Sequence, residues 1–294
     1  MFFKVGSTPI LGVYQASGKF SKCASKNADI KDYEHRTISK ALNLISKDVL
    51  KSLAKVYDLS DNIDDYIFPV PRAVGADLPN CNGDRFSHEE LTRYSSNHRC
   101  LVYQTFRNDP LHVEHAADNP KTARGFIPDA YYVQDNPKDR YVLTVVAMDT
   151  TKDPALAEGL LSGDIDAFSM GCICEAVQCS YSKCRKIAHT DRDMCEHLKH
   201  YRMARFNGEL IFEDCLGVEY QELSVVGDPA YDKARTQYML NATNNNIKKI
   251  EAQKNFKLIN SLLGNEDAVQ VAKFFKENVN RLPEAMLKLG DKLL

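Results

Sequence analysis

Hydrophobic residues follow two different periods along this chain. Between residues 35 and 61 they recur every three or four positions, which places them on one face of a helix: Ile38, Leu42, Ile45, Val49, Leu53 and Val56. From Tyr66 to about Asp228 the chain changes to short runs rich in Val, Ile, Tyr and Phe, separated by turn residues. The pattern predicts an amphipathic helix followed by a core of β-strands.

Two short helices are expected among these strands. Asp153 and Pro154 are typical of a helix start and Gly163 of a helix end, so residues 153–163 are predicted to be helical. Near residue 82 an Asn-Gly turn leads to Ser87, which with Glu90 has the spacing of a helix N-cap. Both segments are interpreted as structural.

The changes of pattern divide the chain into three parts. Residues 1–65 are predicted to form an arm and the amphipathic helix, 66–234 the core, and 235–294 a helical tail that contains an Asn-rich break. The expected fold class is α+β, with a β-rich core and flanking helices.

Composition narrows the class of protein. The 294 residues carry 38 Lys and Arg against 40 Asp and Glu, a formal charge of -2, which argues against a specific nucleic-acid partner, although a local basic patch stays possible. No run of eighteen apolar residues and no signal-like start is present, so we expect a soluble, cytoplasmic protein without a membrane partner.

Cysteine spacing indicates a metal site. The chain has nine cysteines, an odd number, and five of them lie within 24 residues (Cys172, Cys174, Cys179, Cys184, Cys195). In a reducing compartment such a cluster favours metal over disulfides. The set Cys179, Cys184, Cys195 and His197 supplies three thiolates and an imidazole for a closed structural Zn²⁺ site within an insert at 174–200. Replacement of a ligand by Cys174, His189 or His200, an iron–sulfur cluster and a metal-free insert are open alternatives.

Ser169 is the candidate nucleophile. In an extended strand it shares a face with Ala167 and Gly171, while Phe168 and Met170 lie on the other face. Small neighbours leave room for a substrate backbone to approach the hydroxyl. A serine on a half-buried strand is more often structural, so this position needs a partner base.

Two histidines are candidate bases. His112 and His115 are three residues apart and point to opposite faces if the segment is extended, so one of them at most faces Ser169. Their spacing does not fit the zinc-helix signature, which needs histidines four apart. Farther along, Glu222 shares a strand face with Ser224, and a carboxylate there could orient a histidine.

The order of these segments resembles the prohead (head-maturation) proteases of tailed phages, whose core is similar to the herpesvirus assemblin fold. The resemblance covers about residues 66–234. It rests on His115 ten residues before Gly125, on Ser169 two residues before Gly171, and on the Glu-hydrophobic-Ser-hydrophobic-Val segment at 222–226 that leads to a Pro-Ala pair ending at residue 230.

This resemblance implies a barrel-like protease core with Ser169 as nucleophile, His115 as general base and Glu222 as orienting acid. His112 is the alternative base, and Asp149 or Asp166 the alternative third member. The oxyanion-hole donors are left unassigned.

The resemblance also implies a serine endopeptidase that cleaves scaffold and major capsid proteins, and itself, as a homo-oligomer inside the prohead in the infected host cytoplasm. The rival hypothesis is a catalytically silent capsid-assembly or scaffold-interaction protein with a structural zinc. A zinc-finger nucleic-acid binder is the weaker rival, because the chain is near neutral.

Overall fold

The computed structural model describes residues 2–4, 42, 44–136 and 138–240. It is mixed α/β, with a sheet-rich core and four α-helices among these residues. The predicted arm beyond Lys4 and the predicted tail from residue 241 onward lie outside the described residues. None of the described helices is long and apolar enough to cross a membrane.

The helices are short and begin at the expected capping residues. The Ser87 side chain accepts from the Glu90 N–H, and the Asp153 side chain accepts from the Leu156 N–H, as the sequence predicts. Gly163 ends its helix in the left-handed conformation, at φ 80°. The helices are α2 (Lys47–Tyr57), α3 (His88–Thr92), α4 (Pro154–Ser162) and α5 (Glu196–Tyr201), with 3₁₀ turns at Ile63–Asp65, Val102–Phe106, Pro120–Thr122 and Asp191–Asp193.

The amphipathic helix buries a different face from the one predicted. The residues of α2 that are buried are Leu50, Ala54 and Tyr57, each one position after the predicted Val49, Leu53 and Val56. The prediction of the buried face was wrong because two adjacent stripes of this helix are apolar. The Tyr57 hydroxyl donates to the Asn108 carbonyl at 2.8 Å, a contact that the periodicity of the sequence cannot show.

The main sheet contains ten strands in the order β1-β9-β13-β6-β7-β8-β2-β14, with β10 beside β9 and β3 beside β13. Two separate hairpins are β4-β5 and β11-β12. The strands are β1 (Phe2–Lys4), β2 (Tyr66–Gly75), β3 (Asp84–Arg85), β4 (Tyr94–Ser95), β5 (Cys100–Leu101), β6 (Pro110–Val113), β7 (Gly125–Asn136), β8 (Asp139–Asp149), β9 (Phe168–Cys179), β10 (Ile187–Ala188), β11 (Arg205–Phe206), β12 (Glu209–Leu210), β13 (Glu213–Val225) and β14 (Thr236–Leu240).

The sheet is not closed, so the barrel-like form expected from the resemblance is not confirmed. One of the isolated bridges, Ala167–Arg235, joins the start of β9 to the segment before β14. β14 itself lies within the range 235–294 that was expected to be helical. It is a strand because residues 236–240 pair with β2 and so cover that edge of the sheet.

Large side chains fill the core around the middle strands. Every residue of β8 from Tyr141 to Asp149 is buried, as expected for a strand covered on both faces. The Phe106 and Tyr220 rings stack with centroids 3.9 Å apart, and Tyr66 meets Phe126 edge-on at 5.9 Å. This core holds the strands that carry the candidate site.

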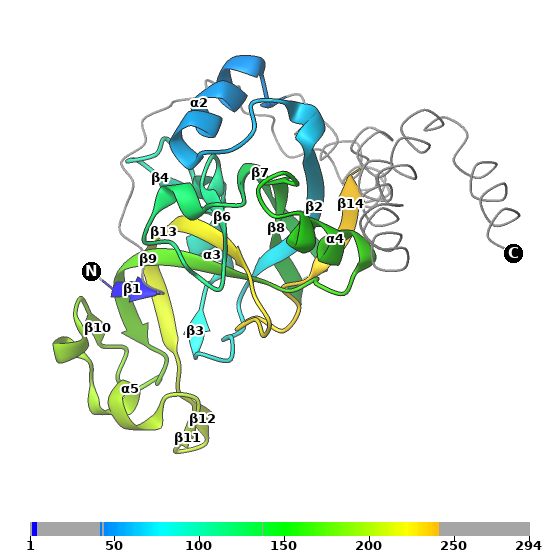
Figure 1. Ribbon diagram of the computed structural model, residues 1–294. Coiled ribbons are helices and arrows are strands. Elements are labelled where there is room, and N and C mark those ends of the chain that lie inside the picture. Colours follow the sequence, from blue (N-terminus) through cyan, green and yellow to red (C-terminus); the bar gives the residue numbers. More distant parts are fainter. Residues whose placement is uncertain (1, 5–41, 43, 137, 241–294) are drawn as a thin grey trace, which may run out of the picture. The chain divides into compact units, whose positions relative to one another are not determined.

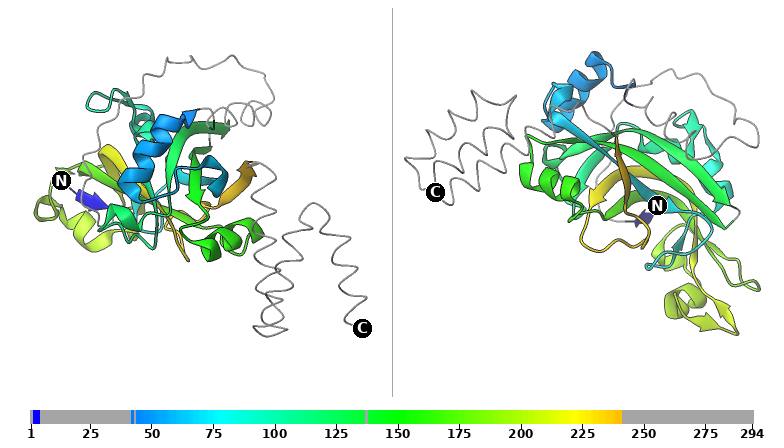
Figure 2. Two further views of the ribbon diagram at one scale, coloured as in Figure 1. Left: turned by 45° about the horizontal axis from the view of Figure 1, so that its top comes forward. Right: turned by 90° about the vertical axis from the view of Figure 1, so that its right-hand side faces the viewer.

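β9 and β13 are neighbouring antiparallel strands connected by residues 180–212, which contain β10, α5 and the β11-β12 hairpin. Figure 1 shows β9 and β13 running side by side toward this insert, and the views of Figure 2 show that the insert lies well apart from α4. The connection therefore takes the chain away from the sheet and returns it beside the strand it left.

Candidate active site and metal centre

Three strands bring the predicted catalytic segments together. In the antiparallel register of β9 and β13, Ser169 lies opposite Ser224 and Gly171 lies opposite Glu222. The parallel register of β13 and β6 places His112 beside Ser224. Residues paired across neighbouring strands point to the same face of the sheet, so these side chains share one face.

His115 reaches this face through a left-handed turn. Its strand, β6, ends at Val113, and the next two residues, Glu114 and His115, have φ values of 49° and 55°. Two hydrogen bonds hold the turn against β13: Glu114 N–H donates to the Val225 carbonyl at 2.9 Å, and His115 N–H donates to Ser224 Oγ at 3.1 Å. The strained backbone is held in place because β13 supplies both acceptors.

The Glu222 carboxyl joins His115 to Ser224. His115 Nδ1 lies 2.7 Å from Glu222 Oε1, and Ser224 Oγ donates to Glu222 Oε2 at 2.6 Å. The Glu222 side chain is only 2 % exposed, whereas that of His115 is 21 % exposed. A carboxylate that accepts the Nδ1 proton leaves the Nε2 lone pair of the neutral ring free to act as a base.

Gly171 provides the space that this carboxyl occupies. A Cβ atom at residue 171 would lie 2.4 Å from Glu222 Oε1 and 2.9 Å from Glu222 Cγ. Any side chain at residue 171 would therefore push the carboxyl away from His115 and Ser224. Residue 171 must therefore be a glycine, because the Glu222 carboxyl occupies the space that a side chain would need.

We expect the substitution Gly171→Ala to lower the free energy of unfolding by about 1–3 kcal/mol, the usual cost of overpacking a buried site. Gly227→Ala is the matched control, because its Cβ would meet only Glu114 Oε1, at 3.8 Å. Denaturant unfolding of both variants measures the difference. Equal losses in the two variants would contradict the crowding at Gly171.

The alternative residues are engaged elsewhere. Asp149 accepts from the N–H groups of Ser60 and Thr151, and Asp166 pairs with Arg235 at 2.6 Å. His112 is buried, and its Nδ1 lies 3.4 Å from Thr122 Oγ1; no hydrogen bond between its ring and a carboxylate is found in the described part of the chain. Burial lowers the pKa of His112 and so favours its neutral form.

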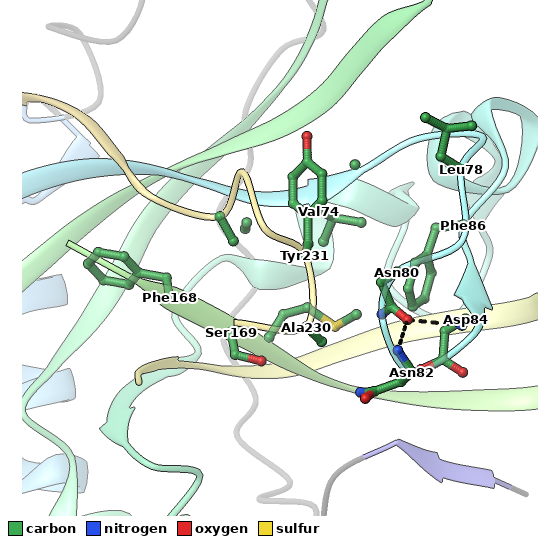
Figure 3. Close-up of a pocket in the computed structure, with 14 residues that line it drawn as sticks. Val74, Leu78, Asn80, Asn82, Asp84, Phe86, Phe168, Ser169, Ala230 and Tyr231 are labelled. Carbon is green, nitrogen blue, oxygen red and sulfur yellow. Dashed lines mark hydrogen bonds between the residues drawn. The ribbon is translucent and has the colours of Figure 1, made fainter. Parts of the chain in front are cut away.

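Ser169 borders a cleft and is not hydrogen-bonded to His115. Within the described residues there is no hydrogen bond between its hydroxyl and the His115 ring. Ser169 is partly exposed at the edge of a cleft drawn in Figure 3. Other residues that line this cleft are Val74, Asn80, Asn82, Phe86, Phe168, Met170, Ala230 and Tyr231.

The four predicted metal ligands converge where the insert leaves the sheet: Cys179 is the last residue of β9 and the other three lie in the insert. The ligand atoms of Cys179, Cys184, Cys195 and His197 lie within 4.8 Å of one another, so this cluster could bind a metal ion. Within the part of the chain that the structure describes, His197 Nδ1 is buried and has no hydrogen-bond partner. Although burial opposes its ionisation, hydrogen bonds from the Leu198 N–H and from His197 lower the pKa of Cys195 to about 7.

The alternative ligands make other contacts. The Cys174 thiol lies 4.0 Å from that of Cys172 inside the core. His189 Nδ1 lies 3.3 Å from the Glu175 carbonyl, and His200 Nε2 lies 2.9 Å from a Glu196 carboxylate oxygen. The spacing of the sequence left these three residues open, whereas the fold separates them from the cluster.

An arginine after α5 connects the insert to the cleft, and the sequence gives no signal for it. Arg202 donates to Asp84 Oδ1 and to Glu213 Oε1, both at 2.7 Å. The Asp84 side chain is 6 % exposed and that of Glu213 is fully buried. Because Asp84 also lines the cleft, its hydrogen bond with Arg202 connects the segment that lines the cleft to the insert.

The substitution Arg202→Met should lower the free energy of unfolding by about 3 kcal/mol, because it removes the cation that pairs with two buried carboxylates. We take the lower end of the usual range because the Arg202 side chain is 32 % exposed. Arg205→Met, at an exposed position nearby, should cost less than about 0.5 kcal/mol. Thermal and denaturant unfolding measure both; a similar loss in the two variants would argue against this role of Arg202.

Comparison of the chain with protein-family models, with curated proteins and with solved structures gives no match.

Proposed function

We propose that this chain is a serine endopeptidase in which Ser169 is the nucleophile, His115 the general base and Glu222 the orienting acid. One observation carries the proposal: a buried carboxylate holds the ring of a partly exposed histidine at 2.7 Å, on the strand face that also carries Ser169. The base comes from the turn after β6, the orienting acid from β13 and the nucleophile from β9, so only the folded sheet assembles them.

The mechanism follows from the hydrogen bonds of His115. While His115 Nδ1–H donates a hydrogen bond to the Glu222 carboxylate, Nε2 accepts the Ser169 proton as Oγ attacks a peptide carbonyl, and the ring then returns that proton to the leaving amine. Water then hydrolyses the acyl-enzyme by the reverse route. The carboxylate of Glu222 stabilises the imidazolium formed in each step, and Ser224 keeps that carboxylate in place.

In the resting arrangement Ser169 and His115 are not hydrogen-bonded, and the pair must come together when substrate binds. The ring of His115 is 21 % exposed and its Nε2 side is not held by the hydrogen bond to Glu222, so the ring has freedom to adjust.

The proposed substrate class and setting rest on the resemblance to tailed-phage prohead proteases. In this proposal the chain cleaves scaffold and major capsid proteins, and itself, as a homo-oligomer within an immature virus head in the host cytoplasm. The assemblin-like, barrel-like form of the core belongs to the same proposal. The order of His115, Ser169 and Glu222 and the bridge between Ala167 and Arg235 support it.

A fluorophosphonate probe should label Ser169 in the wild-type chain, as read by peptide mass spectrometry. His115→Gln should slow this labelling by about 10²–10⁴-fold, because the general base is lost. Ser169→Ala should abolish labelling and self-cleavage, whereas Ser96→Ala, at an exposed serine, should leave both unchanged. A wild-type chain that is not labelled at Ser169 would favour the catalytically silent assembly protein.

We also propose that the ion held by the Cys/His cluster is Zn²⁺. Three thiolates and one imidazole are a ligand set that Zn²⁺ favours in closed structural sites. The ring of His197 packs against both Tyr181 and Phe206, at centroid distances of 4.6 and 4.8 Å, and these contacts restrict its orientation. Such an ion would stabilise the insert and take no part in the hydrolysis, since four protein ligands leave no position for water.

Purified protein should contain about one zinc per chain, and a strong chelator should lower its melting temperature. Cys195→Ser should lose the metal and show the lower melting temperature without chelator. Cys81→Ser is the control, because Cys81 is exposed and outside the cluster. Full zinc content in Cys195→Ser would show that the ligand set is wrong.

A further inference from the structure

The outer edge of β9, the one opposite β13, is covered in separate pieces. At one end Phe168 N–H donates to the Ala234 carbonyl at 2.8 Å. Farther along, residues 172–174 pair with β1, and residues 177–178 pair with β10. Among the described residues, no strand pairs with residues 169–171 on this edge.

The backbone of Met170 points toward this gap. Successive residues of a strand direct their N–H and C=O groups to alternate edges. The Phe168 N–H points to the outer edge, and the Ala167 carbonyl accepts from Val226 on the inner side. By this alternation Met170 presents one donor and one acceptor to the outer edge, directly after Ser169.

An extended peptide fits such an edge. A strand added antiparallel to β9 would exchange both backbone hydrogen bonds with Met170, and its residue opposite Met170 would share the face of the Met170 side chain. That face carries the cleft of Figure 3, whose apolar lining includes Val74, Phe86 and Phe168. The peptide residue opposite Met170 should therefore be apolar.

The chain's own β1 occupies the adjoining part of the same edge. Lys4 lies opposite Cys172 and Phe2 opposite Cys174, in the antiparallel direction that an incoming peptide would take. A peptide that pairs with Met170 and extends beyond Gly171 meets β1 and must displace it.

We propose that the outer edge of β9 receives an extended peptide as an added strand at Met170, and that β1 competes with this peptide for the adjoining residues Cys172–Cys174. This inference rests on the proposed function, because it places the peptide beside the Ser169 nucleophile. β1 then acts as a built-in competitor, and its release lengthens the binding edge.

The test compares two covalent probes of Ser169. A small alkyl fluorophosphonate has no peptide backbone to pair with β9, whereas a tetrapeptide phosphonate with a leucine at its reactive end does. Deletion of Phe2–Lys4 should raise the labelling rate by the tetrapeptide probe about ten-fold, which corresponds to about 1.4 kcal/mol. The rate with the small probe should change less than two-fold.

Two proline variants provide a matched pair. Because of the alternation along β9, the backbone N–H and C=O groups of Phe2 and Lys4 form the hydrogen bonds between β1 and β9. The backbone N–H and C=O groups of Phe3 point away from β9. Lys4→Pro removes one ladder donor and should reproduce part of the increase, whereas Phe3→Pro should not. Amide hydrogen exchange at Cys172 and Cys174 should accelerate in Lys4→Pro, which reports the release of β1 independently of labelling.

The outcomes separate the two proposals. Labelling of Ser169 by the small probe together with an unchanged tetrapeptide rate after deletion of β1 would overturn the competition at the edge of β9 and leave the nucleophile assignment intact. Absence of labelling by the small probe in every variant would overturn the proposed function itself, and the peptide site with it.

Discussion

The arrangement of the candidate site depends on one buried carboxyl group. Glu222 lies on β13 with almost no exposure, and a carboxylate in that position is stable only if both oxygens have partners. His115 serves one oxygen and Ser224 the other. The left-handed turn at Glu114 and His115, the absence of a side chain at Gly171 and the register of three strands all follow from this requirement.

The same requirement connects stability to chemistry. The hydrogen bonds that stabilise the buried Glu222 carboxylate also fix the orientation of the His115 ring. A substitution that displaces this carboxylate should therefore change both the free energy of unfolding and the proposed general base. Ser224 contributes to both: it donates to Glu222 and accepts from the His115 backbone, and it lies directly opposite Ser169. In the proposed mechanism Ser224 is therefore a positioning residue and not a second nucleophile.

The insert adds a second set of buried charges at the other end of the same strands. Arg202 follows the helix that carries His197 and neutralises Asp84 and Glu213. Arg185 follows Cys184 and reaches Asp214, which also pairs with Arg85 of β3. Folding of the insert is thereby coupled to the loop that lines the cleft. The excursion between β9 and β13 can thus support the site without contributing a group to it.

The sequence alone determined the features that depend on local pattern: the capping residues of α3 and α4, the strand-rich texture, and the short stretch in which the candidate cluster ligands lie. It also placed Ser169 with Gly171, and Glu222 with Ser224, on common faces, because alternation along a strand is a local property. Only the tertiary structure decided between His112 and His115 as the partner of Glu222. In an extended strand the two histidines would point to opposite faces, but the positive φ values of Glu114 and His115 turn the chain and bring His115 to Glu222. Only the tertiary structure shows the buried face of α2, the strand at 236–240, the role of Arg202 and the meeting of β1 with β9. Each of these depends on contacts between segments far apart in the chain, and no local periodicity encodes which distant surface a segment will meet.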